Sequence, residues 1–151
     1  MIFDRLARLD LVLPLVNPPK GNYVPAVPSG NLVHAAGQVP MIDGEVVATG
    51  LVGREVDLDE ATRLSRQCAL SALAAVDAAV GLDRVVQVVR VVGYVASAPG
   101  FTDQDAVLDG ASELFALIFG PAGRHARSAV GVPVLPLGAP VEVEVTVEFA
   151  R

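Results

Sequence analysis

The last part of the chain alternates strictly between hydrophobic and polar residues. From Val141 to Phe149, every odd-numbered position carries valine or phenylalanine, and every even-numbered position carries glutamate or threonine. Side chains along a β-strand point alternately to its two faces. This segment is therefore predicted to form a strand with one apolar, buried face and one polar face.

Two longer segments carry hydrophobic residues at the spacing of an α-helix. The first, Asp57–Val80, begins with a candidate N-cap and ends before Gly81. The second runs from about Asp103 to Ile118 and ends at Gly120. Cys68 falls on the apolar face of the first helix, so it is predicted to be a small core residue and not a catalytic nucleophile.

The remaining hydrophobic segments predict a mixed sheet. A short N-terminal helix and a proline-rich connector occupy residues 1–20. The other strands are predicted at Asn22–Val27, Leu32–Gly37, Glu45–Thr49, Arg84–Val95 and Arg127–Val134. The order of elements indicates an α+β fold, a mixed β-sheet backed by two helices on one face. The other face is left uncovered, which favours assembly with further copies of the chain.

Composition narrows the classes of function. The 151 residues are typical of a single domain, and 52% of them are hydrophobic. The net charge of −6 and the lack of a basic run disfavour nucleic-acid binding through phosphate neutralisation. The one cysteine cannot form an intrachain disulfide, which fits a reducing compartment. With no signal peptide and no apolar stretch long enough for a bilayer, we expect a cytoplasmic protein without membrane contact.

Candidate chemistry lies mainly in the last two predicted strands. Arg127 stands in an apolar strand, Glu142 stands in the next, and a short Pro/Gly turn joins the two. On spacing alone, a salt bridge across a hairpin is favoured over a site in which Arg127 holds a carboxylate and Glu142 moves protons. His125 either shapes the mouth of such a site or is an ordinary loop histidine. Tyr23 is either a packing residue or a hydrogen-bond donor to a ligand.

A metal site is not predicted. His34 and His125 are the only histidines, they lie far apart in the sequence, and neither belongs to a metal-binding pattern.

Three short motifs resemble those of one protein family. Ala126–Pro136 reads A-R-S-x-V-x-V-x-x-L-P, Val141–Glu144 reads V-E-x-E, and Gly37–Pro40 reads G-Q-x-P. The chain thereby resembles the Rid (YjgF-like) family of reactive-imine deaminases, whose members are often labelled endoribonuclease L-PSP. The resemblance extends over the whole chain, and the N-terminal extension is similar to that of a longer YjgF-like subgroup. It implies a chorismate-mutase-like (bacillus-type) fold and a homotrimer with ligand clefts between subunits.

The resemblance also implies roles for single residues. Arg127 matches the arginine that grips the substrate carboxylate, and Glu142 matches the acid that positions or activates water. Tyr23 matches an aromatic residue near the cleft, and Ala129 would lend backbone groups close to the imine nitrogen. Two positions depart from the best-known deaminases, which usually carry serine at Ala36 and asparagine at Asp109. The expected substrate-binding residues are Tyr23, Ala36, Gly37, Asp109, His125 and Ala129.

Four functions are compatible with these residues. The leading one is hydrolysis of 2-imino or 2-enamino acids to 2-keto acids and ammonia, which needs no metal or organic cofactor. The second is non-catalytic binding of small carboxylates, which the changes at Ala36 and Asp109 favour slightly. The third is the endoribonuclease activity of the family label, which the acidic net charge disfavours. The fourth is a purely structural trimeric interaction module.

Overall fold

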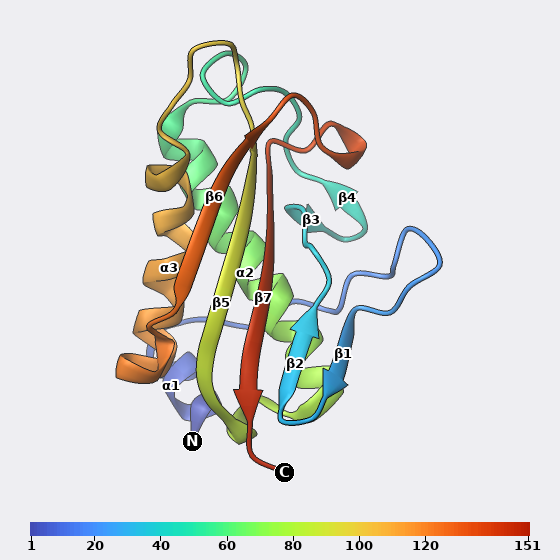
Figure 1. Cartoon of the computed structure of the whole chain (residues 1–151), viewed down its shortest axis with the longest axis vertical. Helices are drawn as coiled ribbons and strands as arrows, with labels where there is room; N and C mark the ends of the chain where they lie inside the picture. The colour runs from blue at the N-terminus through green and yellow to red at the C-terminus, as the bar shows by residue number, and fades with distance from the viewer.

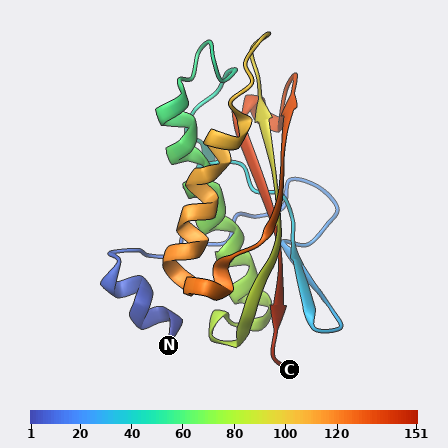
Figure 2. The same cartoon turned by 60° about the vertical axis from the view of Figure 1, so that its left-hand side comes forward.

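Five strands form one mixed sheet that carries two helices on a single face (Figures 1 and 2). The computed structural model describes all 151 residues. The strands follow the spatial order β1-β2-β7-β5-β6. Their bounds are Ala26–Ser29 (β1), Leu32–Ala35 (β2), Val85–Ala96 (β5), Ala126–Val132 (β6) and Val141–Phe149 (β7). The two helices are Leu58–Val80 (α2) and Gln104–Phe119 (α3), and the predicted α+β fold is confirmed.

The position of β5 separates the last two strands of the chain. The α3 crossover places β6 parallel to β5, and β7 then pairs antiparallel with the other edge of β5. Consequently β6 and β7, which follow one another in sequence, are not neighbours in the sheet. The predicted hairpin between them is wrong, because the link through the 3-10 turn Pro136–Gly138 has to step across β5.

The sequence signals at the start of α2 and at the ends of both long helices lie where the structure places these bounds. The Asp57 side chain caps α2 by accepting a hydrogen bond from the Glu60 backbone N–H at 2.8 Å. Gly81 follows α2 with φ +83°, and Gly120 follows α3 with φ +63°, a region in which glycine is unstrained. The short helix α1, Ile2–Arg8, buries Leu6 and lies beside α3, where the Arg5 guanidinium donates to the Leu117 carbonyl at 2.9 Å.

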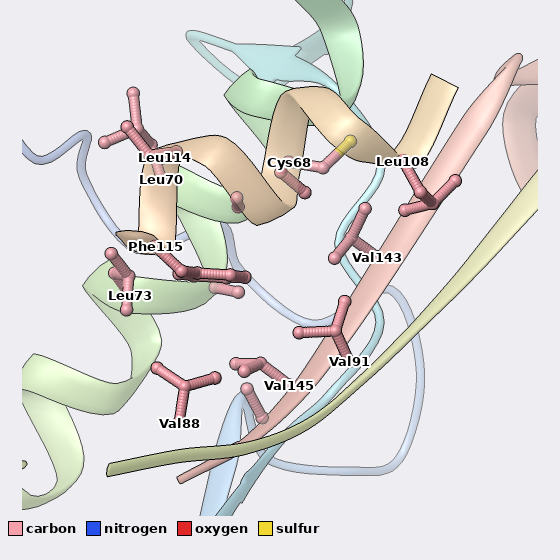
Figure 3. Close-up of a cluster of buried hydrophobic side chains, with 14 of the residues drawn as sticks. Cys68, Leu70, Leu73, Val88, Val91, Leu108, Leu114, Phe115, Val143 and Val145 are labelled. Carbon is pink, nitrogen blue, oxygen red and sulfur yellow. The ribbon is translucent and has the colours of Figure 1, made fainter. Parts of the chain in front are cut away.

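The hydrophobic core lies between the helices and the covered face of the sheet (Figure 3). Valines of β5 and β7, such as Val91 and Val145, meet Phe115 of α3 and Leu73 of α2. The strict alternation predicted for β7 is confirmed, because its odd positions are buried and its even positions are not. Cys68 is fully buried and burial raises the pKa of its thiol, in agreement with a core role.

The third predicted strand, Glu45–Thr49, is confirmed only for Glu45–Val46, and it does not join the main sheet. A separate two-stranded sheet forms here from β3, Met41–Ile42, and β4, Glu45–Val46. Asp43 and Gly44, with φ of 53° and 82°, form the two-residue turn between β3 and β4. The sequence Asp-Gly favours such tight hairpin turns. This small sheet lies outside the main sheet, on the side of β2 (Figure 1).

Helix α3 is apolar enough to resemble a membrane span. By length and mean hydropathy, residues Gln104–Gly123 would be long and apolar enough to cross a membrane. No such stretch was expected from the sequence. Half of this segment is buried inside the fold, where Leu108, Leu114 and Phe115 join the core. Its hydrophobicity is therefore explained by the contacts with α2 and the sheet.

The crossing of α2 and α3 depends on a glycine. A Cβ atom at Gly110 would overlap the Thr62 backbone carbonyl of α2 and approach the Ser65 hydroxyl. We expect Gly110→Ala to lower the free energy of unfolding by about 1–3 kcal/mol, because the backbones must move apart. Urea unfolding measures this change. Gly21→Ala is the control, since a Cβ there lies 3.4 Å or more from its neighbours, and an equal loss in both variants would contradict the prediction.

Candidate functional site

Arg127 is held against α3 by carboxylates of its own chain. Its Nη1 donates to Asp109 Oδ1 at 2.8 Å and to Ser112 Oγ at 3.0 Å. Its Nη2 donates to the Asp105 carbonyl at 3.2 Å and lies 3.4 Å from Asp105 Oδ1. The side chain is 19% exposed, whereas those of Asp105 and Asp109 are 86% and 57% exposed. The guanidinium is thus anchored, by partners that remain in contact with solvent.

Glu142 has the opposite environment. Its side chain is half-buried and forms no salt bridge, and a Cβ atom on Gly37 would overlap its carboxylate. The backbones of Gln38 and Val143 exchange two hydrogen bonds, at 2.8 and 3.0 Å, which bring Gly37 to this position. Burial, and secondarily the neighbouring Glu144, raise the pKa of Glu142 above the usual range for glutamate.

The register of the sheet puts Arg127 and Glu142 on different faces. Arg127 pairs with Val91 of β5, and Val91 pairs with Val145 of β7, so these residues share the face that the helices cover. Glu142 lies three positions before Val145 on β7 and therefore points to the open face. The interpretation of Arg127 and Glu142 as a salt bridge is wrong within one chain, because β5 separates their strands and they face apart.

Three predicted site residues gather near Glu142. Gly37 touches its carboxylate, Ala36 precedes Gly37, and Tyr23 lines a small pocket with Gly37 and Gln38. The proline-rich connector forms the other wall, and the Asn17 amide donates to Gln38 Oε1 at 3.1 Å. Tyr23 is half-exposed, and its hydroxyl accepts a hydrogen bond from the Lys20 N–H at 3.2 Å.

The other predicted site residues gather near Arg127. Asp109 pairs with it directly, and His125 joins it through Ser112, whose Oγ is 2.8 Å from His125 Nε2. Ala129 lies two residues after Arg127 on β6, an edge strand, with its side chain packed against the core. Asp105 and Ser112 were not predicted, although their spacing of four and three residues from Asp109 places all three on one face of α3.

The two histidines do not meet. His34 pairs in register with Thr146, Thr146 with Arg90, and Arg90 with Ala126, the neighbour of His125. Three strand spacings therefore separate the histidines, which is roughly 14 Å. No group of three His, Cys, Asp or Glu side chains is placed to hold a metal ion.

The open face of the sheet carries its own polar network. The Tyr94 hydroxyl donates to Glu144 Oε1 at 2.9 Å, and this hydrogen bond raises the pKa of the tyrosine. Arg90 donates to the Ser128 hydroxyl at 3.1 Å. Exposed valines at positions 86, 89 and 130 interrupt these polar groups. The face combines satisfied polar groups with apolar surface, as subunit interfaces commonly do.

Comparisons with a family model and with known proteins agree on one family. The model of the family described as "YjgF/chorismate_mutase-like, putative endoribonuclease" matches residues 4–149. Protein TCP17 of Trypanosoma cruzi is 45% identical over 146 residues, which cover 95% of this chain and 91% of that protein.

Two solved structures are similar over nearly the whole chain. Atu1372 of Agrobacterium tumefaciens, a protein of unknown function, is 44% identical with a TM-score of 0.90, and the match covers 99% of this chain and 93% of that one. A protein of Shewanella oneidensis described as a putative endoribonuclease is 33% identical with a TM-score of 0.95, and the match covers 99% of each chain.

The raised pKa of Glu142 has a consequence for stability. The folded protein binds this proton more tightly than the unfolded chain does. The stability that the group contributes is therefore present below the unfolded-state pKa and lost as the pH rises through the folded-state pKa. As the pH rises above about 4.5, the ordinary pKa of glutamate, we expect the free energy of unfolding to fall less in Glu142→Gln than in wild type.

Urea unfolding at several pH values measures this difference. Glu148→Gln is the matched control, since Glu148 lies on the same face of β7 but accepts a hydrogen bond from Asn31. A pH slope in Glu142→Gln as steep as that of wild type would contradict the cause assigned to the shift.

Proposed function

We propose that the chain, which belongs to the YjgF/chorismate mutase-like family, hydrolyses 2-imino or 2-enamino acids to 2-keto acids and ammonia. The observation that carries the proposal is Glu142, a half-buried carboxyl group without an ion-pair partner and with a raised pKa. A general acid and base works best when its pKa is near the operating pH. Gly37 supports this role, because its missing side chain leaves space for the Glu142 carboxylate.

The reaction divides between the two residues. Arg127 binds the substrate carboxylate and orients the adjacent imine carbon. Glu142 takes a proton from water as the water oxygen adds to that carbon, the electron pair of the C=N bond moves to nitrogen, and Glu142 passes the proton to that nitrogen. The tetrahedral intermediate then loses its hydroxyl proton through Glu142 to the amine, expels ammonia and leaves the 2-keto acid. A 2-enamino acid enters the same route after protonation at its β-carbon.

The substrate carboxylate has to compete with Asp105 and Asp109 for Arg127. Both aspartate side chains are more than half exposed, so solvent screens them, and a substrate carboxylate can replace one of them while Arg127 stays paired. Exchange of one of these partners for a substrate carboxylate therefore costs little. The negative charge of Asp109 next to the anchor disfavours substrates that carry a second negative group.

A complete site requires two subunits in this proposal. Arg127 and Glu142 lie on different faces of the sheet, so one chain cannot present both to one small substrate. The open face, with its exposed valines, and the free edge of β6 are the surfaces on which further copies would pack. A homotrimer with a cleft between adjacent subunits satisfies this requirement.

The alternatives have less support. A carboxylate binder would use Arg127 alone and would give no role to the raised pKa of Glu142. RNA cleavage, which the family description names, lacks an acid–base pair of histidines within the chain, and the net charge of −6 disfavours contact with phosphates.

Kinetics with imines released by an amino-acid oxidase, followed by semicarbazide trapping, test the two roles. We expect Arg127→Ala to lower kcat/KM about 100-fold, mainly through KM, because a charged hydrogen-bonded anchor is lost. Glu142→Gln should lower kcat roughly 10²- to 10⁴-fold, because the proton acceptor is lost. The controls are Arg63→Ala, an exposed arginine on α2, and Glu148→Gln. Wild-type hydrolysis by Arg127→Ala or Glu142→Gln would overturn the proposal.

Mixed oligomers test the shared site. Subunits carrying Arg127→Ala and subunits carrying Glu142→Gln, each inactive alone, are co-expressed in equal amounts. A site between subunits then needs wild-type Arg127 from one chain and wild-type Glu142 from the next, so random mixing should restore about one quarter of the wild-type activity. Mixtures that stay as inactive as their components would contradict a shared site.

A further inference from the structure

We infer that Ser112, His125 and Arg127 form a second catalytic site, in which Ser112 is the nucleophile for hydrolysis of short esters whose acyl group carries a carboxylate. This site lies on the helix-covered side of the sheet edge, and Glu142 takes no part in it. The inference therefore does not rest on imine hydrolysis, although both reactions would use Arg127.

When the His125 ring is neutral, its neighbours determine the direction of each hydrogen bond in this group. The Gly123 carbonyl can only accept, so His125 Nδ1, at 2.7 Å from it, carries a hydrogen. In the neutral ring, Nε2 then has a free lone pair and accepts the hydroxyl hydrogen of Ser112 at 2.8 Å. Arg127 can only donate, so Ser112 Oγ accepts from Nη1 at 3.0 Å.

An activated serine requires hydrogen bonds in these directions. A general base holds the hydroxyl hydrogen, and a fixed acceptor orients the base through its other nitrogen. Here a backbone carbonyl takes the place that an aspartate has in a Ser-His-Asp triad. The Phe115 ring meets the His125 ring edge to face, with centroids 5.7 Å apart, and fixes the plane of the imidazole.

The pair opens into a pocket of about 370 Å³. The pocket is lined by Asp109, Ser112, Ala116, Gly123, Arg124, His125 and Arg127. Only Ala116 among these is hydrophobic, so the pocket suits a short polar acyl group and not a fatty acyl chain. Arg124 is exposed and forms no salt bridge, which leaves its guanidinium free to bind a carboxylate on that acyl group.

The reaction follows from these positions. Nε2 of His125 takes the hydroxyl proton as Ser112 Oγ adds to the ester carbonyl carbon, and the C=O electron pair moves to the oxygen. The Arg127 Nη1 hydrogen that points at Oγ is within reach of this oxyanion. The alkoxide leaves with the proton from Nε2, and an acyl-serine remains. Water, deprotonated by Nε2, then releases the carboxylic acid and restores the Ser112 hydroxyl.

The alternative is that Ser112 and His125 form a structural brace, which only holds Arg127 in place. This alternative explains fewer of the contacts than a catalytic role does. A brace needs Ser112 Oγ as an acceptor, but it needs neither a base on the hydroxyl hydrogen nor an acceptor that fixes the ring. Asp109 and Asp105 already hold the guanidinium without His125. An open pocket in front of the serine is also unnecessary for a brace.

Covalent labelling of the full-length protein by a fluorophosphonate, mapped by peptide mass spectrometry, tests the nucleophile. We expect one adduct on Ser112 in wild type and none in Ser112→Ala. In His125→Gln the amide still accepts the hydroxyl hydrogen but is not a base, so labelling should be about 100-fold slower. Ser128→Ala is the matched control, because Ser128 lies on β6 and bonds to Arg90 without a histidine. This variant should label like wild type.

Hydrolysis of 4-nitrophenyl hemisuccinate and 4-nitrophenyl acetate tests the substrate class. Arg124→Ala should reduce the preference for the hemisuccinate roughly 10-fold, because one charged hydrogen-bonding partner is lost. The unfolding temperature of every variant shows whether its fold is intact. Absence of an adduct on Ser112 in wild type, equal labelling rates of wild type and a folded His125→Gln, or no change of preference in Arg124→Ala would overturn the inference.

Discussion

The fold buries only one face of its sheet, and the placement of every functional group depends on this constraint. Val91 and Val145 have to face the helices, because they fill the core between α2, α3 and the sheet (Figure 3). Their register neighbour Arg127 is thereby directed towards α3, and Glu142, at an even position of β7, is directed to the open face. One chain consequently carries a cationic group, Arg127, at the edge of the sheet and an acidic group, Glu142, on its open face.

Arg127 and Glu142 have opposite electrostatic surroundings. The Arg127 cation is hydrogen-bonded by two aspartates and a serine, which keep it in one position. Glu142 is desolvated without a partner, which raises its pKa and makes proton exchange easier. An anchor has to be held in place, whereas an acid–base group has to be poised between two states. The surroundings of Arg127 and Glu142 therefore fit the roles proposed for them, a substrate anchor and an acid–base group.

Arg127 is common to both proposed sites. One of its Nη1 hydrogens is directed at Ser112 and the other at Asp109, and its Nη2 contacts Asp105. A carboxylate bound to the guanidinium and an oxyanion formed at Ser112 would draw on the same donor group. The two chemistries would therefore exclude one another at a given arginine, even though their other residues lie on different sides of the sheet. The close approach of α3 to α2 at Gly110 positions the aspartates and the serine that the arginine needs.

The sequence by itself determined the elements, because each long element repeats a local signal. The alternation of β7, the cap at Asp57 and the glycines after both helices define bounds that the structure confirms. The family also followed from three short motifs. The separation of β6 from β7 by β5 could not be predicted, because strand order depends on contacts far apart in the chain. The hairpin β3–β4 was missed, although its Asp43-Gly44 turn is a local sequence signal. Only the tertiary structure decided that β5 separates Arg127 from Glu142, and that a serine of α3 meets a histidine that follows it by thirteen residues. Side-chain chemistry can be read along a chain, but distances between such side chains are set by packing.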